Sequence, residues 1–199
     1  MKNIITTLLF VLITIITYSQ NNKRSLSSSD YDNWKYIEDK AISNDGNWIL
    51  YESNPYQGDG KIVFYNVNTK QKTRFERAKN ATFSANSDYA AFKIYPYNDT
   101  IRSLKLDDTP KDKLPKDSLE IFILSTNKTI KVEDIKSFKL SEKESSWMAY
   151  SYNKFIPEDT TKKEDEKEEK TFDKSAPETN DFVIFNPIED KKYEFTNVT

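Results

Sequence analysis

The sequence predicts an all-β protein built from repeated antiparallel four-stranded units, and three observations support this prediction. The chain of 199 residues is rich in aromatic side chains, with 12 Tyr, 12 Phe and 3 Trp. Aromatic and β-branched residues fit the pleated, half-buried surface of a strand. Short apolar segments alternate with polar turns, and separate stretches of the chain repeat the same order of these parts.

Each repeated unit contains a serine corner, at Ser43, Ser84 and Ser141, and each of these serines follows an apolar residue. In the first unit, Asp45-Gly46 supplies a tight turn because glycine is free to take positive φ. Serine and aspartate side chains can also hydrogen-bond local backbone at such corners. A strand with an aromatic residue at each end follows each corner: Trp48–Tyr51, Tyr89–Phe92 and Trp147–Tyr150.

A hairpin completes each unit, beginning at Ile62, Leu119 and Phe182. Each hairpin consists of an apolar strand, a polar tip and a short alternating strand, a pattern that is typical of antiparallel neighbours. A further short strand leads into the serine, as in Ala81–Phe83, so that one unit is a four-stranded meander. The polar tips are Asn68–Lys70, Thr126–Lys128 and Glu189–Lys191.

The spacing of the units favours propeller-type blades. The interval from Trp48 to Tyr89 lies in the range of about 40 to 50 residues that one blade takes. A β-sandwich of hairpins that are similar by chance is the alternative, and the shared order of parts disfavours it. We therefore expect a partial β-propeller over residues 36–199, an incomplete ring of about three blades. The expected blades cover about 36–76, 77–133 and 134–199.

Charged loop insertions are predicted at 96–117 and 153–180, at one place in the second and third units. Insertions at one structural position fall on one face of a repeat array. Residues 107–117 carry two prolines and alternating charge, which predicts an exposed loop. Residues 157–179 have Phe172 as their one large apolar side chain, which predicts a disordered, solvated loop. Interleaved lysines oppose a calcium site at the acidic positions within 164–169.

The N-terminus reads as an export signal. Lys2 precedes an apolar run from Ile4 to Ile16, and small residues precede a predicted cleavage site at Ser19–Gln20. A transmembrane anchor is the alternative, but the run is shorter than the roughly 20 residues that span a bilayer. We therefore expect a signal peptide over 1–19, a flexible lead-in over 20–35, a periplasmic or extracellular location and no stable membrane anchor.

The composition excludes several classes of active site. The chain has no histidine, no cysteine and three glycines. It therefore lacks the residues for a Ser-His-Asp triad, a thiolate nucleophile, a cysteine or histidine zinc site, and a glycine-rich phosphate loop. The 30 basic and 32 acidic residues are interspersed, which disfavours nucleic-acid binding. We predict no catalytic, cofactor-binding or metal-binding residue in this chain.

A few side chains could still bind or react. A carboxylate pair could act as in a glycosidase, but nothing marks a pair as buried, and surface salt bridging is the favoured interpretation. Asp59, between Gly58 and Gly60, is explained by turn formation. Exposed aromatic residues could stack on sugars or peptides, although packing within or between blades is favoured. These residues are Tyr56, Tyr95 and Tyr97.

The unit from Ser43 to Tyr51 resembles a TolB-type or WD-like propeller repeat. Together with Tyr31–Lys35, Gly58–Gly60 and Pro115–Leu119, it resembles the N-terminal region of exported serine peptidases of the prolyl-oligopeptidase family, over roughly residues 30–199. The resemblance implies a propeller that admits only peptides, followed by a C-terminal α/β-hydrolase domain that holds the Ser, Asp and His. None of those catalytic positions occurs in this chain, so none is carried over.

Two functions are consistent with these features. In the first, the chain is the N-terminal propeller portion of such a peptidase, because the family's propellers have more blades than this chain supplies. Its partners are then the α/β-hydrolase domain of the parent chain and the parent's peptide substrates. In the second, the chain is an exported, non-catalytic propeller-repeat binding or scaffold module that closes its ring by oligomerising. In both cases we expect no peptidase activity from this chain alone.

Overall fold

The computed structural model describes residues 4–5, 25–31, 34–143, 145–152 and 180–198. The chain divides into two compact units, residues 1–34 and 35–199. The described part of the first unit contains the short helix α2 (Ser28–Tyr31), which the sequence did not predict. The predicted signal peptide and its cleavage site lie outside the described residues except for Ile4 and Ile5. The predicted disordered insertion at 153–180 also lies outside them, apart from Asn180.

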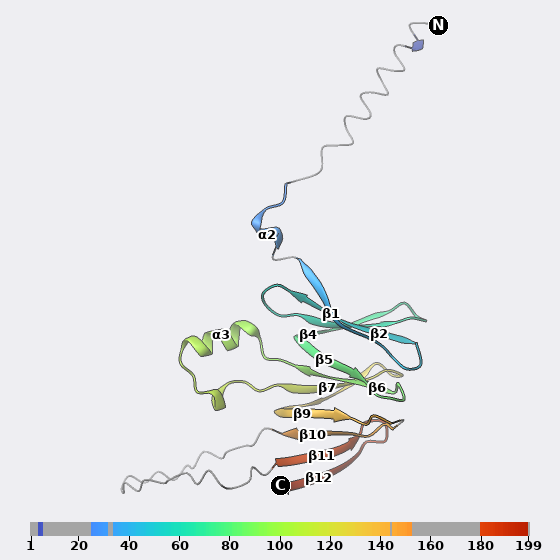
Figure 1. Ribbon diagram of the computed structural model, residues 1–199, viewed down its shortest axis with the longest axis vertical. Coiled ribbons are helices and arrows are strands. Elements are labelled where there is room, and N and C mark those ends of the chain that lie inside the picture. The colour runs from blue at the N-terminus through green and yellow to red at the C-terminus, as the bar shows by residue number, and fades with distance from the viewer. Residues whose placement is uncertain (1–3, 6–24, 32–33, 144, 153–179, 199) are drawn as a thin grey trace. The chain divides into compact units, whose positions relative to one another are not determined.

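The described residues of the second unit form three antiparallel four-stranded sheets, which we call blades 1, 2 and 3 (Figure 1). Within each blade the strands pair in chain order as a meander, and the described residues form no closed ring. The predicted fold class is thus confirmed. Blade 1 contains β1 (Lys35–Ile42), β2 (Trp48–Pro55), β3 (Lys61–Asn66) and β4 (Lys72–Glu76). Blade 2 contains β5 (Ala78–Phe83), β6 (Tyr89–Ile94), β7 (Ser118–Ile123) and β8 (Lys128–Val132). Blade 3 contains β9 (Ile135–Leu140), β10 (Met148–Tyr152), β11 (Asn180–Asn186) and β12 (Lys191–Val198).

The hydrophobic core lies between the blades. Strand β6 of the middle blade is buried on both faces, because Ala90 and Phe92 join a cluster shared with blade 1. Tyr89 and Ala91, on the opposite face, join a cluster shared with blade 3. Strand β2 of blade 1 instead alternates between buried and half-buried positions. Blade 2 is therefore packed between two other sheets, which is the arrangement that a series of stacked blades requires.

Phe64 lies at the centre of the contact between blades 1 and 2. Its ring centroid is 5.8 Å from that of Phe75 in blade 1. It is 5.9, 5.6 and 5.1 Å from the ring centroids of Phe83, Phe92 and Phe122 in blade 2. Aromatic pairs at such separations stabilise a core by about 0.5 to 1.5 kcal/mol beyond their buried area. This cluster accounts for the high aromatic content of the sequence in this part of the chain.

The repeated aromatic residue gives each blade a direction. We call the face that carries it the front face and the opposite face the back face. Trp48 lies on the front face of blade 1, with its ring centroid 5.8 Å from that of Phe122 in blade 2. Tyr89 lies on the front face of blade 2, in the core shared with Met148 of blade 3. The blades therefore stack front to back along the chain.

Ser43 and Ser84 form the corner that the sequence predicted. At the third corner, the N–H of Trp147 donates to the Ser145 hydroxyl in place of Ser141. The Ser43 hydroxyl oxygen accepts a hydrogen bond from the backbone N–H of Trp48 at 2.9 Å, and the hydroxyl donates to the Asp45 carboxylate. The Ser84 hydroxyl oxygen likewise accepts from the N–H of Tyr89 at 3.1 Å. Both serines are buried. A hydroxyl at this position satisfies backbone groups that the turn leaves without a ladder partner, which explains its recurrence.

Each predicted hairpin tip contains one residue in the left-handed region of φ. These residues are Lys70 at 62°, Asn127 at 55° and Asp190 at 53°. Turns that join antiparallel strands commonly need one such residue. Two of the tips are also supported by the side-chain Oδ1 of an asparagine, which accepts backbone hydrogen bonds. These residues are Asn66 and Asn186.

The insertion at 96–117 contains a helix that the sequence did not predict. Helix α3 spans Asn98–Leu106, and a short 3₁₀ turn, η1, spans Lys111–Lys113. The Asp59 carboxylate, from the link between β2 and β3, accepts a hydrogen bond from the N–H of Asn98 at 3.1 Å. A carboxylate at this end satisfies an otherwise unpaired donor and complements the helix dipole. No helix among the described residues has the length and apolar character needed to cross a membrane.

Gly60 is required by a close approach of two strands. A Cβ atom at this position would lie 1.8 Å from Oδ1 of Asn54, whose side chain is buried. The Asn54 amide also donates to the Glu38 carboxylate at 2.9 Å, so it cannot move without losing a hydrogen bond.

We predict that Gly60→Ala lowers the free energy of unfolding by about 1 to 3 kcal/mol, because Asn54 must be displaced. Urea unfolding measures the loss, and Asn54→Ala supplies the matched background. In that background the clash is absent, so adding Gly60→Ala should cost markedly less. An equal cost in both backgrounds would show that the steric explanation is wrong.

Candidate functional site

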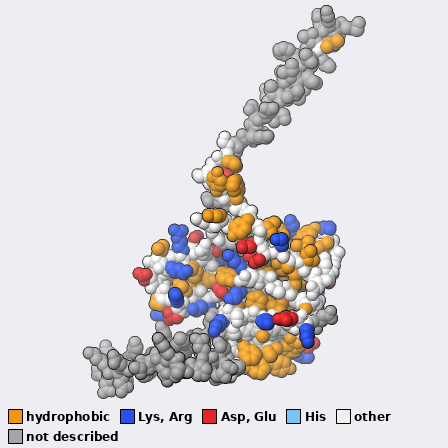
Figure 2. Space-filling view, in the orientation of Figure 1, with side chains coloured by type: hydrophobic (Ala, Val, Ile, Leu, Met, Phe, Trp, Pro, Cys, Tyr) orange, Lys and Arg blue, Asp and Glu red, His pale blue; other side chains and the backbone are white. Residues whose placement is uncertain are grey.

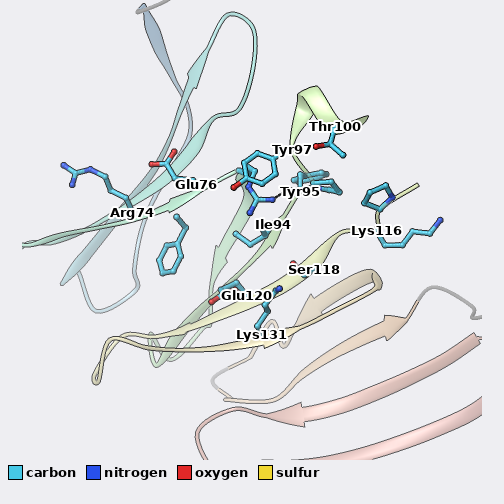
Figure 3. Close-up of a pocket in the computed structure, with 14 residues that line it drawn as sticks. Arg74, Glu76, Ile94, Tyr95, Tyr97, Thr100, Lys116, Ser118, Glu120 and Lys131 are labelled. Carbon is cyan, nitrogen blue, oxygen red and sulfur yellow. Dashed lines mark hydrogen bonds between the residues drawn. The ribbon is translucent and has the colours of Figure 1, made fainter. Parts of the chain in front are cut away.

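A cavity of about 580 Å³ lies where blades 1 and 2 meet the insertion that follows β6 (Figure 3). Its wall combines the ends of β4 and β6 with the start of β7, the end of β8 and the loops on both sides of α3. Four basic and two acidic side chains line it, together with two tyrosines. The lining residues that matter here are Arg74, Glu76, Arg77, Tyr95, Tyr97, Lys116, Glu120 and Lys131.

Arg77 connects the two blades beside this cavity. It follows β4 with a φ of 61°, and its backbone N–H donates to the Gly60 carbonyl at 2.7 Å. Its guanidinium Nη1 donates to the Tyr95 carbonyl at 2.8 Å, and its Cζ lies 4.0 Å from the ring centroid of Tyr97. Its Nε is buried and has no hydrogen-bond partner within the part of the chain that the structure describes. The arginine therefore holds the insertion against the junction of the blades.

The structure separates the three tyrosines that the sequence singled out. Tyr95 and Tyr97 lie together at the junction, where the Tyr95 hydroxyl accepts from the Asn80 amide at 2.9 Å. Burial is the main cause that raises the pKa of Tyr95. Tyr56 is 87% exposed and lies away from this cavity. Tyr95 is thus held within blade 2 by Asn80. Tyr97 is 59% exposed and is covered on one side of its ring by the Arg77 guanidinium. Asp59 has the further role of capping α3.

A second cavity, of about 640 Å³, is lined mainly by β5 and β9, the first strands of blades 2 and 3. We call the first strand of each blade its inner strand. Lys93 lies at its edge, and most of its other lining side chains are small or polar. They include Asn80, Thr82, Ser137, Lys139 and Glu142. Together with the first cavity, it offers hydrogen-bonding and charged groups for a polar ligand.

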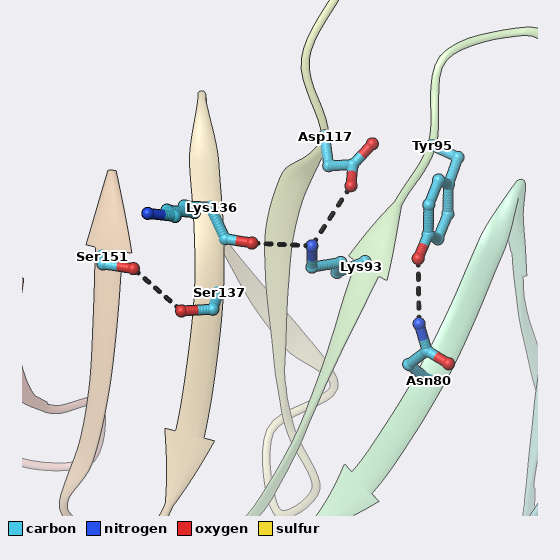
Figure 4. Close-up of polar contacts among 7 residues, drawn as sticks. All are labelled: Asn80, Lys93, Tyr95, Asp117, Lys136, Ser137 and Ser151. Carbon is cyan, nitrogen blue, oxygen red and sulfur yellow. Dashed lines mark hydrogen bonds and ion pairs between the residues drawn. The ribbon is translucent and has the colours of Figure 1, made fainter. Parts of the chain in front are cut away.

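A polar side chain at one repeated position ties each blade to the next. Glu52 and Lys93 both come four residues after the repeated aromatic residue of their blade. The Glu52 carboxylate accepts from the N–H of Asn80 in blade 2 at 2.7 Å. The Lys93 ammonium donates to the Lys136 carbonyl of blade 3 at 2.9 Å and pairs with Asp117 at 3.2 Å (Figure 4). At the same position of blade 3, the Ser151 hydroxyl shares a hydrogen bond with Ser137 of its own sheet.

Polar contacts between the serine corners join the blades at the other end of the strands. The Asn44 amide of blade 1 donates to the Ala85 carbonyl of blade 2 at 2.7 Å. The Ser146 hydroxyl of blade 3 donates to the Asp88 carboxylate of blade 2 at 2.7 Å. Each interface between blades therefore has an apolar centre and hydrogen bonds at both ends, which fixes the register of one sheet on the next.

Among the described residues, no group of three or more Asp, Glu, His or Cys side chains could hold a metal ion. Sequence reasoning assigned no catalytic, cofactor or metal residue, and it also overlooked Glu52 and Lys93. Their common distance from the repeated aromatic residue was the available signal. The cavities present hydrogen-bonding, charged and aromatic groups to a polar molecule.

Glu52 is 2% exposed, and burial raises the pKa of its carboxyl group, against the lowering effect of the Asn80 hydrogen bond. A carboxyl group with a raised pKa in the folded state stabilises the fold fully below its unfolded pKa. That contribution is lost as the pH rises through the folded pKa.

We therefore predict that wild type gains stability relative to Glu52→Gln when the pH falls from 7 towards 4. The amide keeps an acceptor for Asn80 but does not titrate. Urea unfolding at several pH values measures this difference. Glu52→Ala is the comparison, and it should lose about 1 to 3 kcal/mol at pH 7 because the Asn80 N–H loses its partner. A pH-independent difference between wild type and Glu52→Gln would contradict the prediction.

No protein-family model matches the sequence, and no curated protein matches it. Among solved structures, the chain is similar to the β-propeller domain of the Trilobed protease from Pyrococcus furiosus. The TM-score is 0.45 at 14% identity, over 81% of this chain and 43% of that chain. It is also similar to the acylaminoacyl peptidase of Pyrococcus horikoshii, with a TM-score of 0.48 at 14% identity, over 87% of this chain and 27% of that chain.

A third similar structure comes from a study of two prolyl endopeptidases, with a TM-score of 0.48 at 15% identity, over 83% of this chain and 22% of that chain. A eukaryotic initiation factor is also similar, with a TM-score of 0.41 at 13% identity, over 82% of this chain and 33% of that chain. The three peptidase structures match the β-propeller fold of this chain. The chain spans less than half the length of each of these proteins.

Proposed function

We propose that this chain is the N-terminal propeller portion of an exported serine peptidase, where it screens peptide access to an α/β-hydrolase domain of the same protein. One observation carries the proposal: the blades stack front to back, and the outermost faces of blades 1 and 3 still carry the apolar side chains that interior faces use for packing. Tyr193 and Phe195 of blade 3, for example, are 56% and 41% exposed. Sheets with such faces belong to a larger ring of blades.

The choice of a peptidase is supported by the order of the matched segments from Tyr31–Lys35 to Pro115–Leu119. The absence of histidine fits a domain whose contribution is access rather than bond cleavage. Export is part of the proposal and is supported by the apolar run from Ile4 to Ile16 with its cleavage pattern at Ser19–Gln20.

The inter-blade contacts suggest how screening would work. A ring of blades leaves a central channel lined by its inner strands. Glu52 and Lys93 each join their blade to the inner strand of the next one, so they resist separation of the blades at the channel. A channel held at constant width admits an extended peptide and excludes a folded protein.

We predict that the reading frame followed beyond codon 199 encodes a G-x-S-x-G nucleophile motif and, later, an Asp and a His. The longer product should hydrolyse a short peptide p-nitroanilide, and the 199-residue chain alone should not. Its N-terminal residue after export should be Gln20. A frame without the motif, or turnover by the short chain, would contradict the proposal.

The screening role can be tested apart from peptide hydrolysis, by comparing the cleavage of large and small substrates. In the longer product, Lys93→Ala should increase the cleavage of a protein substrate such as casein much more than it changes the turnover of a short peptide. Lys128→Ala is the matched control, because Lys128 is exposed at the start of β8 and lines neither cavity. Equal discrimination between large and small substrates in wild type and in Lys93→Ala would show that these contacts do not control access.

A further inference from the structure

The front face of blade 3 carries apolar side chains at positions that are covered in blades 1 and 2. The pairing registers place Phe195 of β12 at the position held by Phe75 in blade 1 and Val132 in blade 2. Phe75 and Val132 each pack against a core cluster. Phe195 instead stacks on Phe182 of its own sheet, with ring centroids 4.8 Å apart, and it stays 41% exposed.

Two further aromatic side chains extend this surface. Trp147 is the repeated aromatic residue of its blade, and its ring stacks on Tyr193 with centroids 5.7 Å apart. Figure 2 shows a cluster of hydrophobic side chains at the lower right of the second unit, where Figure 1 places β11 and β12. The front face of blade 3 is therefore a contiguous apolar surface, of the kind that marks an interaction site in a soluble protein.

The back face of blade 1 carries aromatic side chains at the positions by which the back faces of blades 2 and 3 pack. By register, Tyr51 and Tyr65 hold the positions of Phe92 and Phe122 in blade 2. The same positions in blade 3 are Tyr150 and Phe185, which are buried in the core shared with blade 2. Ile42, at the end of β1, is 65% exposed, and the position corresponds to Phe83 in β5, which packs against a core cluster.

The backbone of β1 also repeats a feature of a covered back face. In β5 the ladder is interrupted between Lys79 and Thr82, and Asn80, with a φ of 59°, offers its N–H to Glu52 of the preceding blade. In β1 the ladder is interrupted between Glu38 and Lys40, around Asp39 with a φ of 37°. Blade 1 therefore carries both the apolar and the backbone features by which a back face docks.

We infer that two copies of this chain bind head to tail, with the front face of blade 3 of one copy on the back face of blade 1 of the other. At both internal interfaces a front face is covered by a back face, so the described residues themselves show what covers such a surface. Two contacts of this kind close a ring of six blades, which lies within the range of about four to eight for closed propellers.

This inference does not rest on the proposed peptidase function. In a longer product the same two faces would be covered by neighbouring blades of the same chain. In a solution of the 199-residue chain, we assign that cover to a second copy. Failure of the peptidase proposal would therefore leave this inference standing. A chain that does not dimerise would likewise leave the peptidase proposal standing.

The absence of cysteine makes a direct test possible, because single introduced thiols have no competitor. Phe75 and Phe92 contact each other across the covered interface between blades 1 and 2, with ring centroids 4.7 Å apart. Their counterparts in the proposed contact are Phe195 and Tyr51. Phe195→Cys and Tyr51→Cys are made as separate 199-residue chains, mixed, and treated with a short thiol-to-thiol cross-linker. Tyr56→Cys is the control, since Tyr56 is 87% exposed and lies in the link after β2.

We expect sedimentation equilibrium to show a dimer of the cysteine-free chain, and the Phe195→Cys and Tyr51→Cys mixture to give a cross-linked dimer. Phe195→Cys alone, or mixed with Tyr56→Cys, should give little product. A monomer at all concentrations would overturn the inference, as would a front-to-front product from Phe195→Cys alone that equals the mixed one.

Tyr193→Lys, checked for folding by circular dichroism, should also dissociate the dimer. A folded Tyr193→Lys chain that remains dimeric would overturn the inference as well.

Discussion

Each blade has two apolar faces, and neither can be left in water without cost; most features of the structure follow from this constraint. A two-sided sheet must be covered by another sheet on each side, and burial of apolar area is the largest favourable contribution to folding. Strand β6, which is buried on both faces, shows the result. The aromatic cluster around Phe64 fills the space between two blades. The serine corners and the polar residues at the strand ends then determine how one blade sits on the next.

The features that could be predicted from the sequence are those governed by local rules. The serine corners, the aromatic strands and the polar tips each depend on a few neighbouring residues. The structure contains the corners at Ser43 and Ser84 and all three tips, and the third strand begins one residue later than predicted, at Met148. Helix α3 was missed because its segment is charged and flanked by prolines, and because Asp59, which caps it, comes from a distant link. The Glu52 contact was missed for a similar reason. Its partner, Asn80, is distant in the sequence, and the backbone at Asn80 takes a conformation that a single sequence does not reveal.

The candidate site differs from an enzyme centre in what its charged groups do. Arg77, Glu52 and Lys93 each bond to backbone groups of another element, so their charges serve the joining of sheets. Among the described residues, the surfaces that could meet a ligand or partner include the two cavities and the outer faces of the terminal blades.

The contacts of Glu52 and Lys93 also make the blades non-interchangeable. Glu52 is an acceptor that meets an N–H of blade 2, whereas Lys93 is a donor that meets a carbonyl of blade 3. If recombination between the similar repeats deleted blade 2, the Glu52 carboxylate would face the Lys136 carbonyl, and a buried charge would meet a second acceptor. Repeats that arose by duplication would thus have become protected against further loss, because each interface requires its own neighbour. The order of the blades is therefore specified by an acceptor at the first interface and a donor at the second.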